Sequence, residues 1–280
     1  MKPTSTKVLT TTVSSLAMAV SLASASTAVH AEDTIADAIK NGTANLSFRL
    51  RYEDVNDDAS TKEDANVLTL KSRITLKSAG FKNISALVEV DDVTALGDKD
   101  YNDTVNGKSQ YATIADPEDT EVNQAYLAYS GVENTTLKWG RQRILLDNQR
   151  FVGGVGWRQN EQTYDAFSIT NKSLPDTTLF YANINNVNRI FGEDSSVGDQ
   201  EHSTHLINAK YSGLGLGTLT AYAYLIDNED AAVSSSDTYG LRFTGVKELK
   251  EGIKALYEAE WSTQSDADDN PTDYDADYYH

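Results

Sequence analysis

Charged side chains recur two residues apart in three short segments of the sequence. Residues two apart point to the same face of a β-strand, so neighbouring strands would bring these pairs together. Facing basic and acidic rows could set a field across a pore and select solutes by charge. They could instead neutralise one another, so that burial in a narrow barrel is tolerated. Both interpretations stay open for these pairs: Arg49 and Arg51, Lys71 and Arg73, and Glu89 and Asp91.

A second basic group lies between residues 139 and 167. One strand end and the loop after it hold four arginines: Arg141, Arg143, Arg150 and Arg158. Guanidinium groups bind carboxylates through paired hydrogen bonds, so this segment suits an anionic ligand. Its glycines match neither a Walker loop nor a dinucleotide fingerprint. We expect a loop that folds inward and narrows a channel, with an ordinary surface loop as the alternative.

The last charged group, Arg242, Glu258 and Glu260, lies on two later segments. Paired acids can do acid–base chemistry, but acids two apart on one strand also describe an acidic channel wall. Apart from His30 and the final residue, the histidines are His202 and His205, so a Ser-His-acid site has few candidates. We therefore expect no catalytic residues and no cofactor, and keep an outer-membrane barrel enzyme as a minor alternative.

The segments that carry these residues have the period of two that is typical of β-strands. In the first, Leu46, Phe48, Leu50 and Tyr52 alternate with polar residues. A Lys or Arg facing lipid at mid-membrane costs about 2–4 kcal/mol, so we expect the basic residues to face the lumen. The expected strands are residues 44–53, 67–77, 84–91, 122–129, 135–141, 164–171, 177–185, 203–211, 218–226, 238–244 and 253–261, with a twelfth starting at Tyr278.

The connections between the expected strands alternate in length. The short ones are residues 78–83, 130–134, 172–176, 212–217 and 245–252. The long ones are residues 54–66, 92–121, 142–163, 186–202, 227–237 and 262–277. Short turns on one side and long loops on the other are typical of a membrane barrel. A secreted carbohydrate-binding β-sandwich remains the alternative, although its Greek-key connections give no such rhythm.

The N-terminus predicts export. Lys2 and Lys7 precede an apolar run that ends at Ala31, as in a signal peptide cleaved after that residue. Removing two lysines changes the net charge from −18 to −20, so nucleic acid is an unsuitable partner. The chain has no cysteine, which excludes disulfides and thiolate metal sites. Asp266, Asp268 and Asn270 are spaced like the start of a calcium loop, but Pro271 replaces the required glycine, and we expect no metal site.

Three short motifs in the basic segment resemble the alginate export family of outer-membrane porins: Gly140-Arg141-Gln142, Trp157-Arg158-Gln159 and Tyr164-Asp165-Ala166-Phe167. The resemblance implies a channel whose luminal arginines attract an anionic, uronate-like solute. It assigns Arg141, Arg143 and Arg158 to the channel and Gln142 and Gln159 to supporting polar roles. The acids Glu89, Asp91, Glu258 and Glu260 depart from a purely basic lumen, which weakens strict alginate selectivity.

Together these patterns predict an all-β, antiparallel transmembrane barrel in the outer membrane of a Gram-negative bacterium. Residues 1–31 form the signal peptide, residues 32–43 a short periplasmic segment with a helix, and residues 44–280 the barrel domain. We expect further strands beyond His280, because Tyr278 opens a strand that stops at once. The expected partners are lipid, lipopolysaccharide and an anionic small molecule or oligosaccharide.

Overall fold

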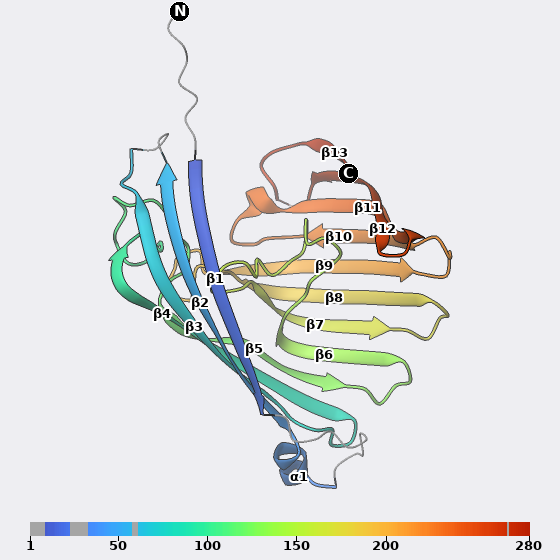
Figure 1. The fold of residues 1–280 in the computed structure, drawn as a ribbon. Coiled ribbons are helices and arrows are strands. Elements are labelled where there is room, and N and C mark those ends of the chain that lie inside the picture. The colour runs from blue at the N-terminus through green and yellow to red at the C-terminus, as the bar shows by residue number, and fades with distance from the viewer. Residues whose placement is uncertain (1–8, 23–32, 58–60, 268) are drawn as a thin grey trace, which may run out of the picture.

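One antiparallel sheet makes up almost the whole structure. The computed structural model describes residues 9–22, 33–57, 61–267 and 269–280, and its thirteen strands pair in chain order (Figure 1). The strands are β1 (Leu9–Leu22), β2 (Thr43–Asp57), β3 (Ala65–Lys77), β4 (Ile84–Asp100), β5 (Asp119–Tyr129), β6 (Thr135–Gln142), β7 (Thr163–Asn171), β8 (Thr177–Asn188), β9 (Asp199–Tyr211), β10 (Thr218–Ile226), β11 (Ser236–Lys250), β12 (Ile253–Asp266) and β13 (Asp275–Tyr279).

The sheet curls around a hollow, with β2–β4 on one side and β9–β12 on the other (Figure 1). We call these the N-terminal wall and the C-terminal wall. A single sheet that follows chain order is the topology of a meander and excludes the β-sandwich alternative, which needs two packed sheets. The expected all-β antiparallel fold is confirmed.

The burial of side chains along the strands is the inverse of that in a soluble protein. In β2, the inward Arg51 and Glu53 are 1% and 2% exposed, whereas Tyr52 between them is 41% exposed. In β9, Asn208 is buried and the neighbouring Ile207 is exposed. A polar interior and an apolar outer surface are what a barrel in lipid requires.

Exposed aromatic rings lie toward both ends of the strands. Tyr129 and Tyr211 border short turns, while Tyr52, Tyr239 and Trp261 lie toward the long loops. Rings of this kind sit at the two membrane interfaces of outer-membrane barrels. Their placement therefore marks two interfacial girdles around an apolar band.

The expected alternation of short and long connections is confirmed, although several strands extend beyond their expected bounds. β4 runs to Asp100, so the loop begins nine residues later than expected; the strand continues past a bulge where Gly97 has φ 76°. β11 and β12 pair along their whole length, from Ser236 opposite Asp266 to Lys250 opposite Ile253. The expected turn 245–252 therefore shrinks to Glu251 and Gly252, with Gly252 at φ 78°. Glycine adopts this left-handed backbone without steric cost, which is why each strand can bend or reverse there.

Two short helices and the position of β1 complete the description of the chain. The expected helix is confirmed as α1 (Ile35–Lys40), capped by Thr34, whose hydroxyl oxygen accepts a hydrogen bond from the Asp37 amide. A short 3₁₀ helix, η1 (Ala232–Ser234), lies between β10 and β11. Leu9–Leu22, within the expected signal peptide, forms β1 beside β2. The predicted cleavage point after Ala31 falls outside the described residues. No described helix is long and apolar enough to cross a membrane.

Candidate functional site: a loop across the barrel lumen

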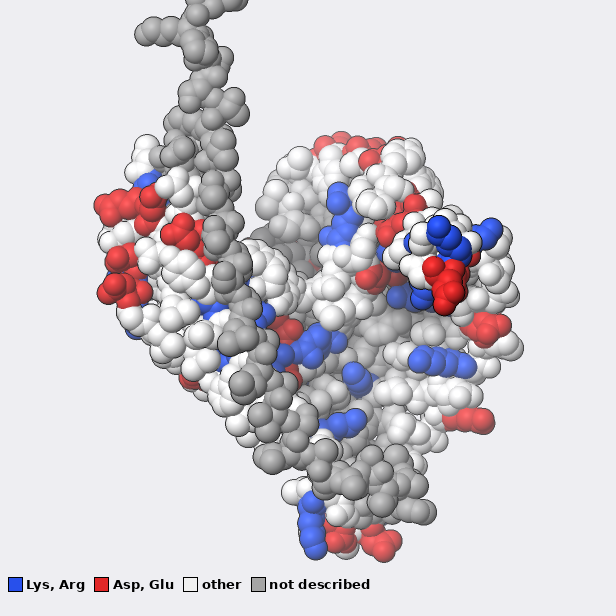
Figure 2. All heavy atoms as spheres, in the orientation of Figure 1, with Lys and Arg blue, Asp and Glu red and all other residues white. Residues whose placement is uncertain are grey.

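The connection between β6 and β7, residues 143–162, folds into the hollow of the sheet. We call it the inner loop. It contacts β2 and β3 of the N-terminal wall and β9, β10 and β12 of the C-terminal wall, so one loop is tethered to both sides. The inward fold expected for the basic segment is what the structure shows, and the surface-loop alternative is wrong. Figure 2 shows Lys and Arg side chains gathered in the hollow where this loop lies.

Gln159 docks the inner loop on the N-terminal wall. Its side chain is fully buried, and its amide nitrogen donates to the Thr69 hydroxyl at 2.7 Å. Its amide oxygen accepts from Nε of Arg49 at 2.8 Å, and its backbone N–H donates to Asp116 at 2.8 Å. Because each hydrogen-bonding group of this buried side chain is used, Gln159 fixes the register of the loop against β2 and β3.

A compact ion cluster lies beside Gln159. Arg51 pairs with Glu53 and with Asp116, the latter at 3.5 Å between Nη1 and Oδ2. Arg158 of the inner loop pairs with the same two acids, at 3.1 Å to Glu53 and 3.8 Å to Asp116. The charges of the two guanidiniums and the two carboxylates cancel. The Trp157 ring stacks against both cations, 4.0 Å from Arg158 and 5.1 Å from Arg51.

A second cluster surrounds Arg73. Its guanidinium pairs with Asp91 at 2.6 Å, Glu161 at 2.8 Å and Glu89 at 3.5 Å. Arg143 joins from the inner loop by pairing with Glu89 at 3.0 Å and with Glu161. Lys71 lies 3.9 Å from Asp91 and completes the cluster of three cations and three acids.

Glu161 holds the inner loop to this second cluster. Burial alone would raise the pKa of Glu161, but hydrogen bonds from Arg143 and the charges of Arg73 and Arg143 outweigh burial and lower the pKa to about 2. The carboxylate is therefore charged at every pH above about 3, and it bridges a cation on the wall to a cation on the loop.

The other end of the inner loop meets the C-terminal wall. Asp147 pairs with Lys210 at 3.0 Å and accepts hydrogen bonds from Asn208 at 2.7 Å and Tyr224 at 3.1 Å. The neighbouring Asn148 donates to Glu260 at 3.0 Å. These contacts bind the loop to strands more than fifty residues further along the chain.

Glu258 and Glu260 of β12 both pair with Arg242 of β11, at 2.7 Å and 3.6 Å. Glu260 also accepts a hydrogen bond from Tyr222 at 2.7 Å. Each carboxylate is therefore engaged by Arg242, and Glu260 is engaged by a phenol hydroxyl as well. This arrangement favours a structural role for the pair over acid–base chemistry.

Arg141 and Gln142 lie at the end of β6. Gly140, at φ 121°, precedes the last two residues of the strand, and Arg141 pairs with Asp165 at 2.9 Å and with Glu193 at 3.3 Å. Gln142 is buried, accepts from the Ser168 hydroxyl at 2.7 Å and donates to the Ala166 carbonyl at 2.9 Å. Its contacts join β6 to β7, as a supporting polar group would.

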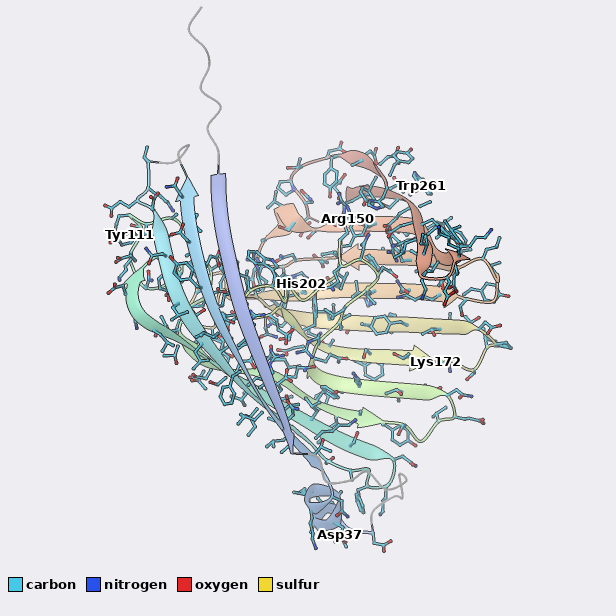
Figure 3. All side chains as sticks on the ribbon, in the orientation of Figure 1. Asp37, Tyr111, Arg150, Lys172, His202 and Trp261 are labelled. Atoms are coloured by element: carbon cyan, nitrogen blue, oxygen red, sulfur yellow. The ribbon has the colours of Figure 1, made fainter. Side chains whose placement is uncertain are left out.

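Arg150, near the middle of the inner loop, differs from the other arginines. Arg150, which is labelled in Figure 3, is exposed, and no described carboxylate pairs with it. Its guanidinium instead stacks 3.8 Å from the centre of the Tyr278 ring. The loop around it forms a cleft of about 690 Å³ lined by Arg143, Asn148, Trp157 and Glu161 among others. A cation in this position would meet a solute that passes the loop.

The acidic partners are the part of this site that the sequence analysis missed. Glu53 could have been found, because it follows Arg51 by two residues on the same strand face. Asp116, Asp147 and Glu161 lie in loops, where no periodic pattern indicates direction. The charges of the expected channel residues are therefore largely paired with acids, as in the second of the two open interpretations.

Comparison with known proteins identifies the family. The sequence model of the alginate export family matches residues 42–280. The fold is similar to OccD3 (OpdP) of Pseudomonas aeruginosa, with a TM-score of 0.61 and 16% identity over 86% of this chain and 53% of that one. It is also similar to OccAB3 of Acinetobacter baumannii, with a TM-score of 0.65 and 13% identity over 86% of this chain and 62% of that one.

No curated protein matches the chain in a sequence search. At these identities the structural likeness shows the fold, which is that of outer-membrane β-barrel porins. The chain spans between half and two thirds of the length of these two structures. The match over most of the sequence shows that the chain belongs to the alginate export family of the Gram-negative outer membrane.

Proposed function

We propose that this protein forms an outer-membrane channel for anionic, uronate-like solutes, with the inner loop as its constriction. The observation that carries the proposal is the tethering of residues 143–162 to both walls, because a loop held on two sides narrows the path between them. The polar interior and apolar exterior of the sheet are those of a barrel in lipid, and Glu258 and Glu260, the acids that an enzyme could use, are both paired with Arg242.

The preference for anions rests on the charges that remain after pairing. Around the inner loop, the two clusters of the N-terminal wall are balanced, and Arg242 is matched by acids. Arg49 and Arg150 have no carboxylate partner within the described part of the chain. Both uncompensated charges attract anions to the constriction. The exposed Arg150 can also bind a carboxylate with two parallel hydrogen bonds.

Reversal potentials in a planar bilayer test this proposal. The full-length protein should pass chloride in preference to potassium, and oligouronates added to one side should block the current. Arg150→Gln should lower the anion preference and weaken the block. Lys172→Gln, in a short turn away from the loop, should change neither. A cation preference in the wild type, without block by oligouronates, would refute the anionic solute.

A further inference from the structure

Arg49 makes an unusual set of contacts for a basic residue in a channel wall. Its guanidinium meets no carboxylate in the described chain and turns to the backbone of the inner loop. Nη1 donates to the Gly156 carbonyl at 3.0 Å, and Nη2 donates to the carbonyls of Trp157, at 3.4 Å, and Arg158. Three consecutive carbonyls therefore converge on one side chain.

The same guanidinium also holds the side chain that docks the loop. Nε of Arg49 donates to Gln159 at 2.8 Å, and the Gln159 amide returns to Thr69 on the next strand. Arg49 thus joins four successive loop residues to β2. Since its donors are directed at the loop, few remain for a solute.

The loop needs such a tether because its backbone is unfavourable on its own. Asp147, Gln149 and Val155 have φ of 53°, 60° and 50°, in the left-handed region that residues with a Cβ adopt at a cost. Val155, which is β-branched, directly precedes the three carbonyls that Arg49 binds. A strained conformation persists only where surrounding contacts enforce it.

We propose that Arg49 is a positioning residue that latches the inner loop and thereby sets the width of the constriction, and that it is not a solute-binding residue. This inference rests on the proposed channel for its consequence, but the latch itself can be tested without transport. Guanidinium geometry is essential to it: the single ammonium of lysine keeps the charge but cannot span three carbonyls and an amide.

Limited trypsin digestion in detergent measures how often the inner loop is released, because Arg150 and Arg158 are cleavage sites on the loop. Cleavage follows the population of the open loop, and each lost charge-assisted hydrogen bond shifts such an equilibrium by about tenfold. Arg49→Lys and Arg49→Gln should both speed cleavage after Arg150 by about tenfold or more, with Lys172→Gln as the control.

Single-channel recordings then distinguish the effect of the loop contacts of Arg49 from the effect of its charge. Arg49→Lys should give a larger and noisier conductance while keeping the anion preference. Arg150→Gln removes one trypsin site, and it should lower the anion preference while cleavage after Arg158 stays at the wild-type rate. If Arg49→Lys matches the wild type in cleavage and conductance, and Arg49→Gln alters selectivity alone, Arg49 acts through its charge and the latch is refuted. If no variant or wild type conducts but cleavage rises as expected, the latch stands and the proposed channel fails. A variant that does not fold is recognised by loss of heat-modifiable migration on a gel. In that case Thr69→Val, which removes the hydroxyl that binds Gln159, tests the same latch from β3. Unchanged cleavage in Thr69→Val would refute the latch.

Discussion

Glu161 offers the sharpest energetic test of how the inner loop is held. Its carboxylate is 9% exposed and bridges Arg73 on β3 to Arg143 on the loop. Glu161→Gln keeps the size of the side chain but removes the charge. Both guanidiniums then lose a shared counter-ion inside the lumen, and we expect the loop to be less stable on the wall.

The size of the effect follows from the pKa. Folding lowers the pKa of Glu161 from 4.5 to about 2, and one unit corresponds to about 1.4 kcal/mol, so its charge stabilises the folded state by about 3 kcal/mol at neutral pH. Removing one partner of a buried pair costs about 3–5 kcal/mol, which agrees with this figure. Because the folded pKa is depressed, the contribution is complete above about pH 5 and is lost as the pH falls toward 2.

Urea unfolding in lipid vesicles, followed by circular dichroism, measures this difference. Glu161→Gln should lower the free energy of unfolding by about 3 kcal/mol at pH 7, and the gap to the wild type should narrow to about half as the pH falls from 5 to 3. Glu133→Gln, at an exposed short turn, should change stability by less than about 0.5 kcal/mol. A difference below about 1 kcal/mol at pH 7, or one that does not depend on pH, would refute the bridging role of Glu161.

Three further substitutions probe the wall. Trp139→Arg places a charge on the lipid-facing side, where Trp139 is 68% exposed, and should lower the free energy of unfolding in vesicles by about 2–4 kcal/mol. Gly240→Val should destabilise by about 1–3 kcal/mol in the same assay, because a Cβ there would lie 2.3 Å from the Tyr222 ring; an unchanged value would show that the ring moves freely. Arg51→Leu leaves Glu53 buried with one cation fewer and should cost about 3–5 kcal/mol in this assay, and a loss below about 1 kcal/mol would contradict the pairing.

The strands could be predicted because a membrane wall imposes a strict period of two. Tyr52 and Ile207 face outward next to buried polar neighbours, and this alternation is visible in the letters of the sequence. Strand ends were harder to predict where apolar residues turn to the inner face. In β4, Val93 and Ala95 are buried on the same face as Asp91, so the alternation of polar inner and apolar outer residues stops there and the sequence predicted an end at Asp91.

The site could be predicted only in part. The basic residues of the strands and the inward fold of the loop followed from charge and composition. Their partners did not, since Asp116 and Glu161 reach the cations from long loops whose path no local pattern encodes. The contacts of Arg49 with three carbonyls were also hidden, because backbone acceptors leave no mark on the sequence.

The central claim is that the inner loop narrows an outer-membrane channel, and single-channel conductance of the full-length protein tests it most directly. Replacing residues 149–155 with a short Gly-Ser linker removes the segment between the two tethers. We expect the wild type to conduct, and we expect a several-fold larger conductance with weaker anion preference in the replacement. A wild type without conductance, or a replacement whose conductance is unchanged, would contradict that claim.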